Sequence, residues 1–195
     1  MGCTQSVTYT KSTYPNAKRT KPQSEVTLAQ QTGLKEEEKR IVKSTWKYMT
    51  KDLSTNGLQV FLKIFELCPE AKKLFQVDNV RHSELARNQV IRAHGTQFMN
   101  AIGAAVDCLN EEEDEYENLD NVLFVLGQQH KGSSGFKPEY FEVFYEALMW
   151  RWGLCIGDKF TSEVADTWSH VFLYMLEKLK EGFYQRKHSI KLQPV

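Results

Sequence analysis

The sequence predicts an all-α fold, on three observations. Each long periodic segment between residues 34 and 184 repeats its apolar residues at three- and four-residue steps, the spacing of an amphipathic helix. No segment alternates apolar and polar residues as a half-buried strand does. The chain has 195 residues, of which 41% are hydrophobic and 12% aromatic, enough for one domain with a sizeable core.

The first half of this region predicts three helices. The first covers residues 34–49, and the second covers residues 56–67 with apolar side chains facing inward. Pro69 cannot continue the second helix, so we expect a short turn that ends at Phe75. After a polar loop, residues 91–109 form the third helix, whose apolar stripe contains Ile91, Phe98, Ile102, Ala105 and Leu109.

The second half predicts three more helices. The acidic residues 110–118 are expected to form a connection, after which residues 119–130 form a helix with leucines on its apolar face. Pro138 opens the next helix, because proline fits the first helical turn. Thr161 or Ser162 caps the last helix, which carries the apolar residues Val164, Trp168, Val171, Phe172, Met175 and Leu179.

The ends of the chain differ from its middle. Residues 1–33 are mostly polar and lack apolar periodicity, so we expect a flexible N-terminal tail. Residues 34–184 form the domain, and residues 185–195 form a short basic tail. No run of 18 apolar residues exists that could span a membrane, and the polar N-terminus does not resemble a secretory signal.

Charge and cysteine content exclude some classes of partner. The 25 basic and 25 acidic residues cancel to a formal net charge of zero, whereas nucleic-acid-binding proteins usually carry a basic excess, so no nucleic-acid partner is expected. The cysteines, Cys3, Cys68, Cys108 and Cys155, lack the spacing of a zinc site. Inert free thiols are expected, and a redox-linked disulfide among the last three stays an alternative.

Two of the five histidines lie on apolar helix faces, His94 in the third predicted helix and His130 at the end of the fourth. A buried histidine is often only hydrogen-bonded to a backbone carbonyl, and that alternative stays open for each one alone. Two such histidines, with aromatic residues on other helices, favour a flat apolar cofactor with a central metal, because imidazole is a common axial ligand of haem iron. His170 shares its helix face with acidic residues and is expected to be solvated.

These residues also carry a family resemblance. Residues 34–184 resemble a globin, closest in character to the neuroglobin and globin X group. Three segments in the family's order carry the resemblance together with Trp46, and they read NGLQVFLKIFELCPEAKKLF, HGTQFMNAIGAA and LGQQHKG. The resemblance implies a single globin fold of about eight helices in a three-on-three arrangement. It also implies haem b, iron protoporphyrin IX, as the cofactor.

The resemblance further implies roles for particular side chains. His130 corresponds to the proximal iron ligand and His94 to the distal histidine, while Phe75 corresponds to the phenylalanine that packs on the haem face. Phe61 and Phe98 are expected to line the distal pocket. Phe98 departs from the usual valine or isoleucine of globins, so its ring is expected to crowd the gas ligand and restrict access.

Two glycines fit the same resemblance. In globins the second and fifth helices cross very closely, which requires small residues at the contact, and Gly57 and Gly95 occupy those positions here. A glycine inside a helix costs about 1 kcal/mol relative to alanine, and a close crossing supplies the reason to tolerate it. The alternative is that Gly57 only lies near a frayed helix start.

The function that the resemblance implies is reversible binding of a diatomic gas, O2, CO or NO, without enzymatic turnover. We expect His94 also to ligate iron in the resting protein, which makes the haem six-coordinate. One alternative is a haem redox enzyme or electron carrier acting on nitrite, nitric oxide or lipid peroxides, which needs an external reductase because the chain lacks a nucleotide-binding glycine motif. A soluble oxygen store and a haemless interaction module stay open as well.

The first six residues, MGCTQS, match the N-myristoylation pattern, with Gly2 as the acceptor after removal of Met1. Cys3 beside it is expected to carry a palmitoyl chain, because a single myristoyl chain binds membranes only marginally whereas two chains hold stably. Globin X proteins share such an acylated start. We therefore expect the protein at the cytoplasmic face of a membrane, the plasma membrane in particular, where sensing or protection from oxidation suits it better than oxygen storage.

Overall fold

The computed structural model describes residues 35–109 and 113–185, and this part of the chain contains helices and no strand. The predicted all-α class is therefore confirmed. The α-helices are α1 Glu36–Trp46, α2 Leu53–Leu67, α3 His82–Leu85, α4 Gln89–Cys108, α5 Glu113–Gly132, α6 Tyr140–Ile156 and α7 Ser162–Tyr184. The short 3-10 helices are η2 Thr50–Asp52, η3 Pro69–Phe75 and η4 Gly157–Lys159, and η3 occupies the turn expected after Pro69.

Side chains that accept hydrogen bonds from the first free N–H groups explain where several helices begin. The Asp52 carboxylate accepts from the backbone N–H of Thr55 at the start of α2. The Asn88 side chain accepts from two N–H groups in the first turn of α4. Thr161, rather than Ser162, caps α7, because its hydroxyl accepts from the backbone N–H of Val164.

The acidic segment corrects one expectation. We expected residues 110–118 to form a connection, but α5 begins at Glu113, so most of the acidic residues lie in its first turns. Negative side chains are favourable there because the N-terminal end of a helix carries a partial positive charge. In addition, the loop expected between the second and third helices contains the single-turn helix α3.

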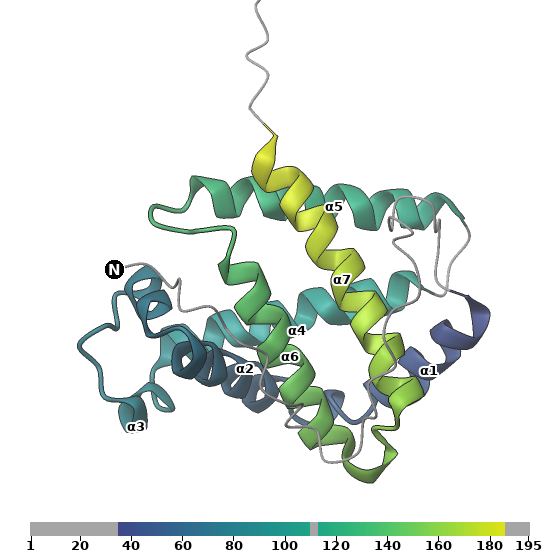
Figure 1. Ribbon diagram of the computed structural model, residues 1–195, viewed down its shortest axis with the longest axis horizontal. Coiled ribbons are helices and arrows are strands. Elements are labelled where there is room, and N and C mark those ends of the chain that lie inside the picture. Colours follow the sequence, from purple (N-terminus) through teal and green to yellow (C-terminus); the bar gives the residue numbers. More distant parts are fainter. Residues whose placement is uncertain (1–34, 110–112, 186–195) are drawn as a thin grey trace, which may run out of the picture.

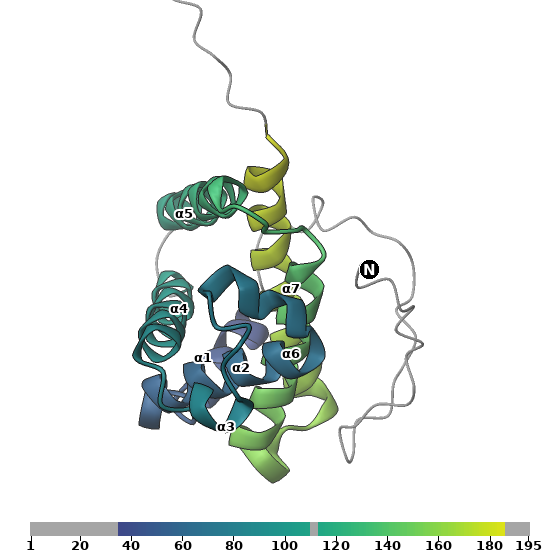
Figure 2. The ribbon, with the colours of Figure 1, turned by 90° about the vertical axis from the view of Figure 1, so that its left-hand side faces the viewer.

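The helices form two groups that cross each other. In both views α5 lies above α4 (Figures 1 and 2). Figure 1 shows α6 and α7 passing across α4, and Figure 2 shows them beside α4 and α5. Figure 1 shows α4 and α5 running in opposite directions, so that the beginning of α4 and the end of α5 come to the same side of the molecule. α7 passes diagonally across α5, with which it makes an extensive contact.

A cluster of indole rings packs α1, α6 and α7 together. The rings of Trp46 and Trp152 stack with centroids 6.1 Å apart, and those of Trp152 and Trp168 meet edge to face at 5.2 Å. Trp152 and Trp168 are fully buried. Trp168 Nε1 donates a hydrogen bond of 2.9 Å to the hydroxyl of Thr45, so its one polar group is satisfied inside the core.

The predicted close crossing of α2 and α4 is confirmed. A Cβ atom added to Gly57 would lie 2.1 Å from the carbonyl oxygen of Gly95, and one added to Gly95 would lie 2.6 Å from the carbonyl carbon of Gly57. Both distances are far below any van der Waals contact, so the two backbones touch directly. Only glycine fits at either position.

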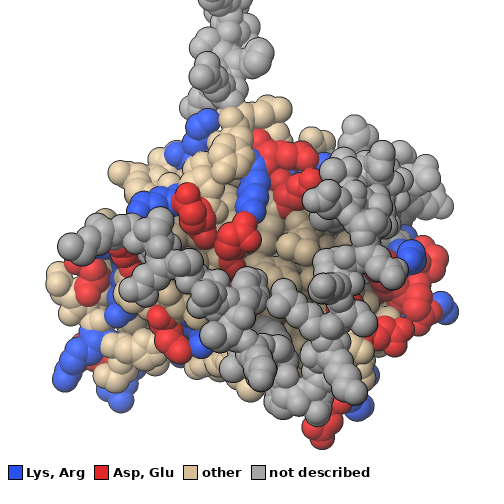
Figure 3. All heavy atoms as spheres, viewed as in Figure 1, with Lys and Arg blue, Asp and Glu red and all other residues tan. Residues whose placement is uncertain are grey.

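The surface carries charges of both signs. On the face shown in Figure 3, the side chains of Lys and Arg alternate with those of Asp and Glu over the described residues. Several of them pair across helices, as Lys180 does with Glu142 and Lys178 with Asp120. None of the helices within residues 35–109 and 113–185 combines the length and apolar character of a membrane span.

Candidate functional site

His94 and His130 come together from two helices that are adjacent in space. His94 lies in the second turn of α4 and His130 in the last turn of α5, and these two helix ends lie on the same side of the molecule. Burial lowers the pKa of His94, and the nearby His130 lowers that pKa further. The neutral imidazole, which is the form that binds metals, is therefore favoured at His94.

Aromatic rings hold His94 in place. Its ring is half-buried and meets the ring of Phe61 at 5.0 Å and that of Phe75 at 5.1 Å, both edge to face. Among the described residues no side chain or backbone group forms a hydrogen bond with either ring nitrogen of His94. An imidazole in apolar surroundings with both nitrogens unpaired is the arrangement expected where a ligand from outside the protein supplies the partner.

A backbone carbonyl orients His130. Its Nδ1 donates a hydrogen bond of 2.7 Å to the carbonyl oxygen of Leu126, one turn earlier in α5. Because a carbonyl can only accept, Nδ1 carries a proton, and in the neutral tautomer the lone pair is on Nε2. The rings of Phe136, at 4.9 Å, and Phe141, at 6.0 Å, flank the imidazole. A hydrogen bond of this kind fixes the orientation of a metal-binding histidine and makes it more basic.

The predicted pocket residues surround His94. Phe75 packs against both Phe61 and Phe65 with ring centroids 5.5 Å away. Phe98, one turn beyond His94, lies 6.2 Å from Phe61 and 4.5 Å from Phe144 of α6. The structure thus brings Phe61, Phe75 and Phe98 together with His94.

The aromatic rings around His130 were not predicted from the sequence. Phe136, Phe141 and Phe183 contact one another near His130, with centroids between 5.1 and 6.0 Å apart. The signal for the first two was the aromatic-rich segment GFKPEYFEVF that follows the histidine. Phe183 lies at the end of α7, far from this segment in the sequence, so no sequence pattern linked it to His130.

The donor set fits a flat metal macrocycle. The two imidazoles offer nitrogen atoms without protein partners among the described residues, and the rings beside them are apolar aromatic groups rather than carboxylates. Such a set suits an iron whose remaining ligands come from a porphyrin, since the apolar walls match the porphyrin faces and imidazole suits iron.

His170 corrects another expectation. We expected it to be solvated, but its Nδ1 lies 2.9 Å from a carboxylate oxygen of Glu38 in α1, and both side chains are only 22% exposed. Burial alone would raise the pKa of Glu38, but hydrogen bonds from His170 and from the backbone of Lys35 outweigh it and hold that pKa below its ordinary value. The pair ties α1 to α7, away from the two histidines of the site.

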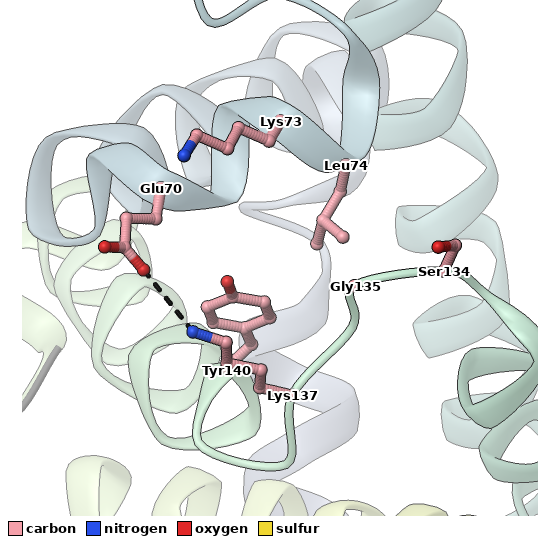
Figure 4. Close-up of a pocket in the computed structure, with 7 residues that line it drawn as sticks. All are labelled: Glu70, Lys73, Leu74, Ser134, Gly135, Lys137 and Tyr140. Atoms are coloured by element: carbon pink, nitrogen blue, oxygen red, sulfur yellow. Dashed lines mark ion pairs between the residues drawn. The ribbon is translucent and has the colours of Figure 1, made fainter. Parts of the chain in front are cut away.

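A surface pocket of about 390 Å³ lies between η3 and the connection from α5 to α6 (Figure 4). A 3.5 Å ion pair between Glu70 and Lys137 bridges one side of it, and the Tyr140 hydroxyl points toward η3. The remaining lining residues are Lys73, Leu74, Ser134 and Gly135. The pocket therefore contains none of the residues predicted for the cofactor.

Two cysteine side chains are described, and neither forms a disulfide. Cys68 is buried and Cys155 is half-buried. The Cys155 thiol donates to the side-chain oxygen of Asn56 at 3.2 Å, and burial raises its pKa. Gly2 and Cys3, the two predicted acylation sites, lie outside the described residues.

The chain is similar to several known proteins. A family model described as Globin matches residues 58–179. Anaerobic nitrite reductase AHB2 of Arabidopsis thaliana is 29% identical over 160 residues, covering 80% of this chain and 97% of that protein. Neuroglobin of Tetraodon nigroviridis is 25% identical over 152 residues, covering 77% of this chain and 92% of that protein.

Solved structures show the same fold. The structure of a hexacoordinated heme protein from an anhydrobiotic tardigrade superposes with a TM-score of 0.72 at 24% identity, covering 78% of this chain and 96% of that one. A Drosophila melanogaster globin gives a TM-score of 0.69 at 17% identity, covering 75% of this chain and 93% of that one.

Proposed function

The chain belongs to the globin family, and from this premise we propose that it binds haem b and reversibly takes up a diatomic gas, O2, CO or NO. The observation that carries the proposal is the pair of imidazoles, His94 and His130, each with a nitrogen that has no partner among the described residues. Haem supplies the iron centre at which a small gas molecule binds. The protein would supply a histidine nitrogen to the iron and apolar aromatic side chains around it.

His130 is the proposed iron ligand on the proximal side. The Leu126 carbonyl holds its Nδ1 proton, which leaves Nε2 to bind iron. Phe75 is the proposed stacking partner of the porphyrin, and Phe61 and Phe98 are the proposed walls of the pocket on the distal side. Haem loss from Phe75→Ser should then exceed that from the Phe65→Leu variant, whose altered side chain packs behind Phe75.

We also propose that His94 binds iron in the resting protein, which gives a six-coordinate haem. The support is its neutral, unpaired imidazole beside His130 and the likeness to a tardigrade protein described as hexacoordinated. In that state the His94 imidazole would occupy the position that a gas molecule needs. In this arrangement Phe98 restricts the space into which the gas enters.

Visible absorption of the ferrous protein without gas tests the six-coordinate form. Sharp, split bands are expected for the wild type, and a single broad band is expected for His94→Leu, because that variant would hold the iron through His130 alone. His82→Leu is the matched control, since His82 is exposed and lies in α3, and its spectrum should match the wild type. A broad band in the wild type that His94→Leu leaves unchanged contradicts the proposal.

A second candidate is a haem redox enzyme that reduces nitrite with electrons from an external reductase. The observation that favours it is the similarity to a plant protein named as an anaerobic nitrite reductase. Oxygen affinity, autoxidation and nitrite reduction should be measured on one preparation. Nitrite turnover that persists with a supplied reductase and accelerates in His94→Leu supports the enzyme, whereas slow stoichiometric reaction supports the gas-binding protein.

We further propose that myristate on Gly2 and palmitate on Cys3 anchor the protein to the cytoplasmic face of the plasma membrane. The support is the sequence pattern alone. In cells with active acyltransferases, the wild type should fractionate with membranes, Gly2→Ala with the cytosol, and Cys3→Ser between the two. A cytosolic wild type contradicts the anchor and favours the soluble oxygen store.

A further inference from the structure

α5 and α7 touch through their backbones at two glycines. A Cβ atom on Gly127 would lie 2.0 Å from the carbonyl oxygen of Leu179, and one on Gly182 would lie 1.9 Å from the carbonyl oxygen of Phe124. The next nearest atoms also belong to the backbone, so no flexible side chain can move aside to make room. This crossing is as close as that of Gly57 and Gly95.

The contact lies next to the group that orients His130. Gly127 follows Leu126, whose carbonyl oxygen accepts the hydrogen bond from His130 Nδ1 at 2.7 Å. That carbonyl and the nitrogen of Gly127 belong to one planar peptide unit, which moves as a rigid body. A displacement of Gly127 therefore displaces the acceptor that sets the angle of the His130 ring.

The opposite partner of the crossing reaches His130 through aromatic rings. Phe183 follows Gly182 and packs against Phe136 at 5.8 Å and against Phe141 at 6.0 Å. Those two rings are the ones that flank His130. The backbone contact of Gly127 and the aromatic contacts of Phe183 thus come from the same turn of α7, and both reach the surroundings of the His130 imidazole.

Polar contacts fix the two helices against sliding. Near the start of α5, Asp120 accepts a hydrogen bond from the Tyr174 hydroxyl and pairs with Lys178 at 3.4 Å. At its end, Lys131 Nζ donates to the carbonyl oxygen of Gln185 at 3.1 Å. The glycine contact lies between these two attachments, so α5 has little freedom to shift along α7.

We propose, building on the proposed role of His130 as iron ligand, that Gly127 and Gly182 are positioning residues: their crossing sets the place and angle of His130 and thereby the strength of its bond to iron. Alanine at either position forces α5 away from α7 and moves the Leu126 carbonyl with it. His130 Nε2, the nitrogen that would bind iron, is then displaced as well.

The test uses the full chain with haem and carries His94→Leu in every sample, so that His130 is the only histidine on iron. Gly127→Ala and Gly182→Ala are compared with Gly132→Ala, a matched control at the end of the same helix where an added Cβ has nothing within 4 Å. The iron–histidine stretching band is measured by resonance Raman spectroscopy on the ferrous protein. Haem loss to excess apomyoglobin is measured in parallel.

Both crossing variants should shift the stretching band and lose haem about tenfold faster, the equivalent of about 1.4 kcal/mol, while Gly132→Ala matches the parent. Crossing variants that keep their helix content and match Gly132→Ala in band and rate overturn the proposal. A parent without any iron–histidine band overturns the ligand role itself, which is a different result from a band that is present and unshifted.

A gentler variant covers the case in which alanine at the crossing prevents folding. Tyr174→Phe removes only the hydroxyl that donates to Asp120, so it weakens one attachment of α5 to α7 without placing a new atom at the crossing. A shift of the same band, smaller than that expected for alanine at the crossing, supports the proposal. A folded Tyr174→Phe protein with the parent's band and rate of haem loss overturns it.

Discussion

His94 and His130 lie in the same region but are held in different ways. His130 has a hydrogen bond to the Leu126 carbonyl, and the helix that carries it is fixed to α7 by backbone contact. His94 has no hydrogen bond among the described residues and is held only by the rings of Phe61 and Phe75. The difference teaches that the His130 ring is fixed in orientation, whereas the His94 ring can turn without breaking a hydrogen bond to any described residue.

The strongest test of this difference removes each histidine in turn. His130→Ala should lose haem about 100-fold faster than the wild type, about 2.7 kcal/mol, because the fixed ligand is gone. His94→Ala should keep its haem, since the iron bond to His130 and the apolar burial both remain. Transfer of haem to excess apomyoglobin measures both rates, and equal losses would show that the two assignments are wrong.

A second test concerns the backbone contact between Gly57 and Gly95, the residue that follows His94. Gly95→Ala places a methyl group against the backbone of Gly57, at 2.6 Å, and should lower the free energy of unfolding by about 1–3 kcal/mol. Gly103→Ala, in the same helix, meets only the Trp46 side chain at 3.4 Å and should change stability little. Chemical denaturation followed by circular dichroism measures both. A Gly95→Ala protein as stable as Gly103→Ala would refute the backbone contact.

A substitution of Phe98 tests whether its ring restricts the space beside His94. Phe98→Val removes the ring that contacts Phe61 and Phe144, so gas should enter faster, by about tenfold or less, which corresponds to about 1.4 kcal/mol in the barrier. Flash photolysis of the CO complex measures the rate. Phe65→Leu, behind Phe75, serves as the control and should leave the rate nearly unchanged. A slower rate in Phe98→Val would contradict the proposed restriction.

The smallest expected effect concerns the pair that Glu38 of α1 forms with His170 of α7. Because the pKa of Glu38 is held below its ordinary value of 4.5, its ionised carboxylate stabilises the fold above that pH, and this contribution is lost as the pH falls below it. Glu38→Gln should remove this acid dependence, with a change of less than about 1 kcal/mol in the free energy of unfolding. Denaturation at neutral and acidic pH measures it. The iron–histidine band should not move, since Glu38 contacts α7 far from Gly182.

The sequence predicts the helices and the histidine pair because both depend on local pattern. Apolar residues at helical spacing identify the buried faces, and His94 and His130 lie on those faces. The crossing at Gly57 and Gly95 was predictable only through the globin resemblance. The equally close crossing at Gly127 and Gly182 was missed, because a single glycine in a helix does not reveal which backbone, some 55 residues away, approaches it.

The same limit explains the error at His170. Its own helix face carries acidic residues, which suggested solvent, but its partner Glu38 comes from α1. Periodicity shows which face of a helix is polar and does not show which neighbouring helix covers it. The acidic residues from Glu113 onward were misjudged for a different reason, since a run of carboxylates is as typical of a loop as of the first turns of a helix.

The crossing of α2 and α4 acts mechanically as a pivot. Two helices rotate against each other most easily about the point where their backbones come closest, and residues far from that point travel farthest. Asn56, beside Gly57, also binds the Met49 carbonyl at 2.7 Å and accepts from Arg151 of α6 at 2.6 Å, so α2 cannot follow the rotation. His94 directly precedes Gly95, so it lies close to the crossing and moves little. Phe98 and the end of α4 lie farther from the crossing and move more. A swing of α4 about this crossing therefore displaces Phe98 and the end of the helix more than His94, whose own ring can turn without breaking a hydrogen bond to any described residue.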